Sequence, residues 1–150
     1  MRPSRLRTAG FTLAEILTAL IVVAVLAALA VPLWRNHLLR VHRADGRAAL
    51  IEVQTAQDKF FGTHARYASG AEVAAPAPQG LGLKAVSEHG FYRIEVTASD
   101  DGLGFVATAH ANSTQGQTED ARCVELTLDH VGRRRAVDAG GEDRSGDCWR

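Results

Sequence analysis

The chain has 150 residues, with 17 basic and 17 acidic side chains and a formal net charge of zero. This length suits one small domain, and the balanced charge gives no global reason to expect a nucleic-acid-binding protein, although local basic patches remain open. The two cysteines, Cys123 and Cys148, come late in the chain at a spacing unlike paired zinc ligands. We therefore expect a disulfide, which requires an oxidising compartment.

The N-terminal part combines a basic leader with a long apolar run. Arg2, Arg5 and Arg7 precede the run, and residues 16–33 carry no charge. A helix over residues 11–34 would be roughly 36 Å long at about 1.5 Å per residue, enough to cross a hydrocarbon core of about 30 Å. Because arginines also follow the run, charge bias does not orient it.

One acidic residue, Glu15, lies about one helical turn inside this segment. A carboxylate costs about 2.5 to 3.5 kcal/mol at mid-membrane and less near an end, so insertion stays favourable but Glu15 is a liability. A secretory signal peptide cleaved after Ala28-Leu29-Ala30 and a plain signal anchor are two possible interpretations. Both leave Glu15 unexplained, and an intramembrane carboxylate is by default a hypothesis about function.

The residues around Glu15 resemble the N-terminal motif of the type IV prepilins. The matching positions are Gly10, Phe11, Thr12, Leu13, Glu15 and Pro32. The resemblance implies cleavage between Gly10 and Phe11 by prepilin peptidase on the cytoplasmic side, methylation of the new Phe11 amine, and retention of the apolar helix. Two positions depart from the family: Ala14 stands where valine or isoleucine is common, and Ala24 where major pilins often have glycine.

Cleavage after Gly10 would give Glu15 the positive partner that it needs. The new amine of Phe11 would lie four residues from Glu15, on the same helix face. In the membrane this pair could form within one chain, and the resemblance implies that in a filament it forms between neighbouring subunits. We therefore expect Glu15 to set subunit register during assembly, since removing one partner would strand a charge in apolar surroundings.

The helix is expected to continue beyond the apolar run. Pro32 predicts a kink rather than an end, because the helical pattern resumes after it. One apolar stripe is predicted from residues spaced at helical intervals, namely Ala49, Val53, Ala56 and Phe60. The pattern predicts a helix to about Phe61 with Gly62 as its cap, and Gly46 as a weak point worth about 1 kcal/mol relative to alanine.

The rest of the chain predicts a sheet after a long connection. Residues 62–90 are rich in glycine and proline and predict little regular structure. Alternating patterns predict four strands, at residues 92–99, 103–109 and 124–129 and in a short segment that ends near Val137. The expected fold class is α+β: a long N-terminal helix kinked at Pro32, with its C-terminal half packed on a four-stranded antiparallel sheet, which by resemblance is the type IV pilin fold.

A disulfide between Cys123 and Cys148 would close a loop of about 25 residues and contribute roughly 3.5 kcal/mol by chain entropy. A late disulfide around the last strand and loop resembles the D-region of pilins. The terminal Asp147-Cys148-Trp149 is similar to minor pilins of the E type.

The sequence carries no motif for catalysis, so we expect no enzyme activity, no cofactor and no metal site. The densest basic cluster, Arg133, Arg134 and Arg135, could contact DNA phosphates. The interpretation that we favour is that these charges protect the edge of a sheet from unwanted pairing. The acidic residues between 138 and 147 lack the liganding spacing of a calcium loop.

The resemblance implies a minor pilin of a type IV pilus, with a leader at residues 1–10, a membrane and filament-core helix at 11–34 and an extracytoplasmic domain at 35–150. The expected partners are other pilin subunits, prepilin peptidase and the inner-membrane pilus assembly machinery, and nucleic acid is a weaker candidate. The expected location is the bacterial inner membrane and then the extracellular pilus, with links to twitching motility and adhesion. Two alternatives stay open: a pseudopilin of a type II secretion system, and a membrane-anchored periplasmic binding domain.

Overall fold

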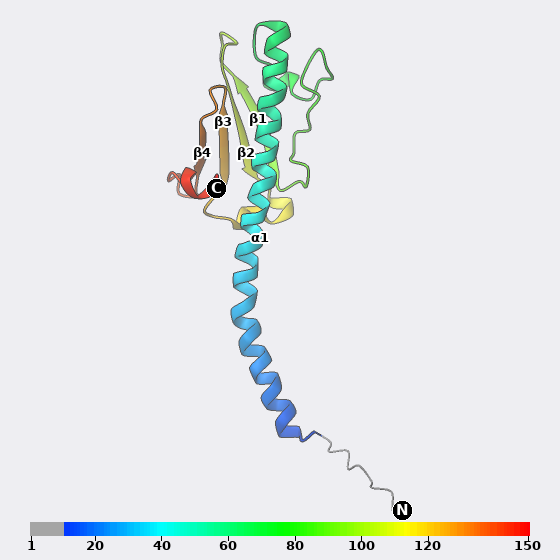
Figure 1. Cartoon of the computed structure of the whole chain (residues 1–150), viewed down its shortest axis with the longest axis vertical. Coiled ribbons are helices and arrows are strands. Elements are labelled where there is room, and N and C mark those ends of the chain that lie inside the picture. The colour runs from blue at the N-terminus through cyan, green and yellow to red at the C-terminus, as the bar shows by residue number, and fades with distance from the viewer. Residues whose placement is uncertain (1–10) are drawn as a thin grey trace, which may run out of the picture. The chain divides into compact units, whose positions relative to one another are not determined.

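The computed structural model describes residues 11–150, so the expected leader and its cleavage residue Gly10 lie outside the described part. The chain forms two compact units, one that ends at Asn36 and one from His37 to Arg150, and each is described by itself. Helix α1, Leu13–His64, begins in the first unit and ends in the second (Figure 1).

The first unit consists of the exposed apolar part of α1. The side chains of its apolar window are exposed, and by length and composition the segment could cross a membrane. A signal sequence near an N-terminus meets the same criteria. Pro32 lies inside α1 without ending it, as its sequence context predicts. The kink at this proline stays a prediction.

The second unit contains a single antiparallel sheet with strand order β1-β2-β3-β4 (Figure 1). The strands are β1 Tyr92–Ala98, β2 Phe105–Ala111, β3 Glu125–Asp129 and β4 Arg134–Val137. The four predicted strands and their meander are confirmed. Strand β2 starts later than predicted because the turn includes Leu103, whose N–H donates to the Asp101 carboxylate, while the Ser99 N–H donates to the Gly104 carbonyl at 2.9 Å.

The core lies between the sheet and the second half of α1. Leu50, Val53 and Phe60 of α1 are buried against it, and Val53 and Phe60 belong to the predicted stripe. The strands contribute buried side chains at alternate positions, namely Tyr92, Ile94, Val96, Phe105, Ala107, Ala109, Leu126, Leu128 and Ala136. This period of two places one face of each strand against the helix and the other in solvent. The predicted α+β architecture is confirmed.

Gly46 has a packing role that its sequence context does not reveal. A Cβ atom at this position would lie 2.8 Å from Cδ2 and 2.9 Å from Cγ of the Tyr92 ring. The glycine therefore lets β1 approach the helix backbone closely. The residue predicted only as a weak point of the helix is the contact surface for the largest buried ring of the sheet.

The predicted helix end at Phe61 and the cap at Gly62 are wrong. Helix α1 continues to His64, and Ala65 adopts the left-handed conformation with φ of 54°. Gln57, which is fully buried, fixes this end: its amide donates to the Ala68 carbonyl at 2.9 Å and accepts from the Ala68 N–H at 2.8 Å. The helix thus ends at a non-glycine residue with positive φ, and Gln57 holds the segment after it against the helix.

The connection from α1 to β1 has little regular structure, as predicted. It contains the short helix η1, Gly70–Glu72, and pairs with the free edge of β1 through an isolated bridge between Val86 and Arg93. Other short helices are η2, Ser113–Gln115, and η3, Gln117–Glu119, between β2 and β3, and α2, Ser145–Cys148, near the C-terminus.

Candidate functional site

Glu15 caps the start of α1. Its Oε2 accepts hydrogen bonds from the N–H and from the hydroxyl of Thr12, both at 2.9 Å, and the Glu15 N–H donates to the Thr12 hydroxyl at 3.2 Å. This reciprocal arrangement satisfies backbone donors that a helix start leaves unpaired. Phe11 and Glu15 are both exposed, so the carboxylate is accessible to a partner.

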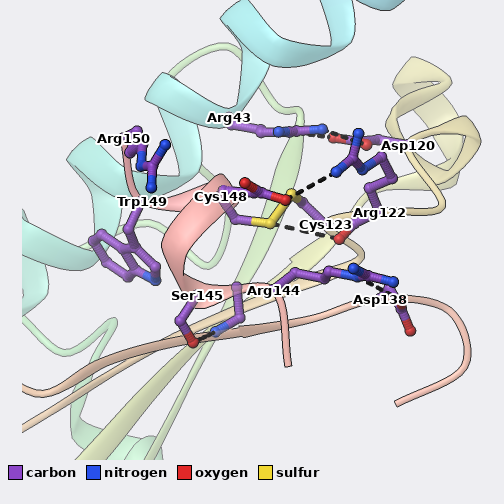
Figure 2. Close-up of a disulfide and its surroundings, with 12 residues drawn as sticks. Arg43, Asp120, Arg122, Cys123, Asp138, Arg144, Ser145, Cys148, Trp149 and Arg150 are labelled. Atoms are coloured by element: carbon purple, nitrogen blue, oxygen red, sulfur yellow. Dashed lines mark hydrogen bonds and ion pairs between the residues drawn. A yellow bond between two sulfur atoms is a disulfide. The ribbon is translucent and has the colours of Figure 1, made fainter. Parts of the chain in front are cut away.

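The predicted disulfide is present, with the Cα atoms of Cys123 and Cys148 5.9 Å apart and both residues fully buried (Figure 2). The bond thereby joins Cys123, two residues before β3, to Cys148 in the C-terminal helix α2. Arg122 and Asp147, each next to one of the cysteines, form an ion pair at 2.8 Å on the outside of the bridge. The bond thus fixes the last residues of the chain against the sheet.

The acidic loop after β4 uses its carboxylates internally. Asp138 accepts from the N–H groups of Gly140 and Glu142, at 2.9 and 3.0 Å, and from Nε of Arg144 at 3.0 Å. Figure 2 shows the contact between Asp138 and Arg144. The Arg144 hydrogen bond is the main cause that lowers the pKa of Asp138. Asp143 similarly accepts from the N–H and hydroxyl of Ser145. These contacts hold the loop in place.

The arginine cluster lies on the edge strand β4 and at its start, and all three side chains are exposed. Arg133 is 3.9 Å from the Asp129 carboxylate. The guanidinium of Arg134 lies over the ring of Trp149, with Cζ 5.4 Å from the ring centroid. Because alternate residues of a strand face opposite sides, Arg134 and Arg135 do not share one face. The edge-protection interpretation and a local phosphate contact are both compatible with this placement.

Two further arginines, Arg47 and Arg150, meet at the C-terminal segment. Arg150 follows Trp149 directly, and Arg47 of α1 donates a hydrogen bond to the backbone carbonyl of Arg150. Tertiary structure therefore brings Arg47 of α1 to the C-terminal residue Arg150, a contact that no sequence motif indicates.

The second unit as a whole is not basic. Four of the 17 basic residues and one of the 17 acidic residues precede His37, so residues 37–150 have three more acidic than basic side chains. A polyanion would be repelled by the average field of this unit. Any contact with nucleic acid therefore depends on a local cluster.

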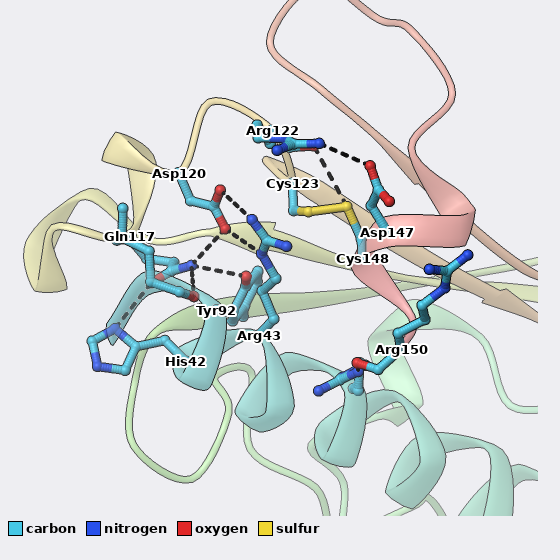
Figure 3. Close-up of polar contacts among 12 residues, drawn as sticks. His42, Arg43, Tyr92, Gln117, Asp120, Arg122, Cys123, Asp147, Cys148 and Arg150 are labelled. Carbon is cyan, nitrogen blue, oxygen red and sulfur yellow. Dashed lines mark hydrogen bonds and ion pairs between the residues drawn. A yellow bond between two sulfur atoms is a disulfide. The ribbon is translucent and has the colours of Figure 1, made fainter. Parts of the chain in front are cut away.

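A buried polar network joins α1 to the segment between β2 and β3 (Figure 3). Arg43 and Asp120 form a two-pronged ion pair, with Nε to Oδ2 at 2.7 Å and Nη2 to Oδ1 at 2.9 Å. Their side chains are only 9% and 3% exposed. A pair this deeply buried is costly to break by removing one partner.

Gln117 is the hub of the same network. Its Nε2 donates to the Tyr92 hydroxyl at 3.1 Å and to the Leu39 carbonyl at 3.2 Å, and its Oε1 is hydrogen-bonded to the His42 ring at 3.0 Å. Burial raises the pKa of Tyr92 to about 12. Sequence reasoning missed the network, because its members belong to three separate segments and none of them forms a motif.

No metal centre is formed within residues 11–150 by clustered His, Cys, Asp or Glu side chains. His110 comes nearest, with Glu95 3.6 Å from its Nε2 and Glu125 3.4 Å from its Nδ1. The two carboxylates lie on different ring nitrogens and so do not converge on one point.

A groove of about 500 Å³ lies between α1 and the connection to β1, and Phe60, Pro78 and Leu81 contribute to its walls. The exposed surface in it is mostly apolar. It offers no convergent set of polar groups that would identify a ligand.

The long helix, the four-stranded antiparallel meander on its C-terminal half and the late disulfide define the class of type IV pilins. The sequence model of the family described as "Type IV minor pilin ComP, DNA uptake sequence receptor" matches residues 32–127, and the chain belongs to this family.

Among solved structures, the chain is similar to a type IV pilin from Shewanella oneidensis. The identity is 24% and the TM-score 0.44, and the match covers 64% of this chain and 89% of that chain. No curated protein matches significantly.

Proposed function

We propose that this chain is a minor subunit of a type IV pilus, held in the bacterial inner membrane before assembly and in the extracellular filament afterwards. The observation that carries the proposal is the minor-pilin family match over residues 32–127. The exposed apolar helix in front of the matched region supports it, because such a segment needs lipid or other subunits around it. In this proposal residues 11–34 are the anchor and filament core, and residues 35–150 are the extracytoplasmic domain.

Processing follows the prepilin route in this proposal: prepilin peptidase removes residues 1–10, and the Phe11 amine is methylated. Intact-mass and N-terminal mass spectrometry of the chain from membranes tests it. We expect a terminus at methylated Phe11. A terminus at Val31 would instead support a cleaved signal peptide, and an intact Met1 would support a simple anchor.

Glu15 acts in assembly through a positive partner on a neighbouring subunit. We expect Glu15→Ala to leave membrane insertion intact and to reduce the amount of this subunit in sheared pili. Glu52→Ala is the matched control, because Glu52 is an exposed acidic residue in the second half of the same helix. Equal amounts of wild-type and Glu15→Ala subunit in the sheared fraction would contradict the proposed role.

Filament assembly would link the subunit to twitching motility and adhesion, with the inner-membrane assembly machinery as partner. Deleting the gene and counting surface pili tests a priming role. Unchanged pilus number with the subunit present in wild-type filaments would show a subunit that is incorporated without priming.

A second candidate function is DNA binding by the exported domain. The matched family is described as a DNA uptake sequence receptor, and this chain has exposed arginines at residues 133–135. Because the unit is acidic overall, we propose that duplex DNA contacts this local cluster through its phosphates. The full chain in neutral detergent is titrated with a short DNA duplex at several salt concentrations.

Replacing Arg133, Arg134 and Arg135 by glutamine is expected to weaken binding and to lower the slope of log K against log salt by about 0.9 for each lost phosphate contact. The control replaces Arg122 and Arg144 by glutamine. These two arginines already form ion pairs with Asp147 and Asp138. An equal loss of binding per charge in the control would show that only net charge matters.

A further inference from the structure

Trp149 is held in place from three directions. Its indole Nε1 donates a hydrogen bond to the backbone carbonyl of Arg135 at 2.8 Å, and its ring lies beneath the Arg134 guanidinium. The preceding residue, Cys148, is fully buried and is covalently joined to Cys123 (Figure 2). The ring therefore has a fixed position relative to the sheet although it is next to the last residue of the chain.

Arg134 contacts an aromatic ring, whereas its neighbouring arginines contact carboxylates. Arg133 lies near Asp129, and Arg122 and Arg144 each pair with a carboxylate. Among residues 11–150, the contact recorded for the Arg134 side chain is the face of an aromatic ring, which attracts the cation without neutralising it. Its positive charge stays available to an anion.

Stacking on the Trp149 ring should reduce the entropy that the Arg134 side chain loses when it binds an anion. A free arginine side chain loses rotamer freedom when it contacts a phosphate, and this loss opposes association. Stacking on the indole restricts Arg134 before the ligand arrives. The planar guanidinium can then present its N–H donors to a phosphate oxygen with a smaller entropic loss.

We propose that Trp149 is a positioning residue that holds the Arg134 guanidinium ready for a backbone phosphate of duplex DNA. This inference rests on the DNA binding proposed above. The partner follows from charge complementarity: Arg134 belongs to the exposed run of arginines at residues 133–135, and a phosphate backbone is the regular array of negative charge that such a run fits. The Cys123–Cys148 disulfide maintains the arrangement by fixing the residue before the tryptophan.

A double-mutant cycle tests the role of Trp149 with the full chain in neutral detergent and a short DNA duplex. Trp149→Ala is expected to weaken binding by about 2- to 5-fold, the range of an exposed cation–ring contact. In a chain that already carries Arg134→Gln, the same change is expected to have no further effect, because the residue on which it acts is gone. Trp149→Phe keeps an aromatic face and is expected to retain most of the affinity.

The outcomes separate this inference from the function on which it rests. If wild type does not bind the duplex, the proposed DNA binding fails. If wild type binds and the triple arginine variant does not, but Trp149→Ala weakens binding equally with and without Arg134, then Trp149 acts through direct stacking or overall stability and the inference is overturned. Urea midpoints of each variant identify a loss of folding, which Trp149→Phe is expected to avoid.

Discussion

Replacing Gly46 by alanine tests the packing of α1 on the sheet, and Gly62 provides a matched control in the same helix. A Cβ at residue 46 would lie 2.8, 2.9 and 3.0 Å from three carbons of the Tyr92 ring, whereas a Cβ at residue 62 would have no neighbouring atom within 4 Å. The two substitutions add the same methyl group to the same kind of backbone. Their effects on stability should differ in sign.

The expected magnitudes follow from two opposing effects. Alanine is favoured over glycine inside a helix by about 1 kcal/mol. At residue 46 the Tyr92 ring has little room to retreat, because it is fully buried and its hydroxyl is hydrogen-bonded to Gln117 at 3.1 Å. Overpacking of this kind costs about 1–3 kcal/mol. We therefore expect Gly46→Ala to destabilise the domain by up to about 2 kcal/mol, and Gly62→Ala to stabilise it by about 0.5–1 kcal/mol near the helix end.

The measurement is urea unfolding of the full chain in neutral detergent, followed by near-ultraviolet circular dichroism, which reports the packed aromatic side chains. At an unchanged slope, the midpoint should fall for Gly46→Ala and rise for Gly62→Ala. If Gly46→Ala raised the midpoint as much as Gly62→Ala, the close approach of Tyr92 to the helix would be refuted.

Three further predictions concern charges and the disulfide. Asp120→Ala should destabilise the domain by about 3–5 kcal/mol, because it leaves Arg43 buried without its partner, whereas Asp100→Ala at an exposed turn should change the urea midpoint little. The double change Arg43→Met with Asp120→Leu should cost much less than Asp120→Ala, and an equal or larger cost would contradict the buried-pair argument. The hydrogen bond from Arg66 is the main cause that lowers the pKa of Glu72 from 4.5 to about 2. Since the folded-state pKa of Glu72 is depressed, the stabilisation from its pairing with Arg66 is present above about pH 4.5 and is lost as the pH falls towards 2. The difference in urea midpoint between wild type and Glu72→Gln should therefore shrink over that range. A difference that stays constant with pH would show that the Arg66–Glu72 pair is not its source. Replacing Cys123 and Cys148 together by serine should lower the free energy of unfolding by about 3.5 kcal/mol for a sequence separation of 25, and an unchanged midpoint in non-reducing buffer would contradict a stabilising disulfide.

Local patterns were enough to predict most of the secondary structure. Alternation in residues 92–99 predicted β1, which the structure places at Tyr92–Ala98, because one sheet face is buried and the other is solvated, and the same reasoning predicted the other strands. The helix end was predicted wrongly, because the helix runs through Gly62 to His64 and Ala65 takes the left-handed conformation, while Gln57 binds the backbone of Ala68 beyond it. A local glycine signal cannot anticipate a contact that spans a turn.

The features of the candidate site also fall into two groups, those that the sequence indicated and those that only the structure shows. Sequence indicated the segment around Glu15, because a carboxylate in an apolar run is conspicuous, and it indicated the disulfide from the position of two cysteines. The buried pair of Arg43 and Asp120, 77 residues apart, has no sequence signal.

By itself, then, the sequence determined the apolar helix with its acidic residue, the order of strands and the late cross-link, since each depends on spacing within one segment. Tertiary structure alone decided which residues meet across segments. The Tyr92 ring packs against Gly46, and the Trp149 ring lies beneath the Arg134 guanidinium. The physical reason is that these contacts depend on how the sheet and the C-terminal segment pack, and hydrophobic periodicity fixes which faces are buried but not which side chains touch.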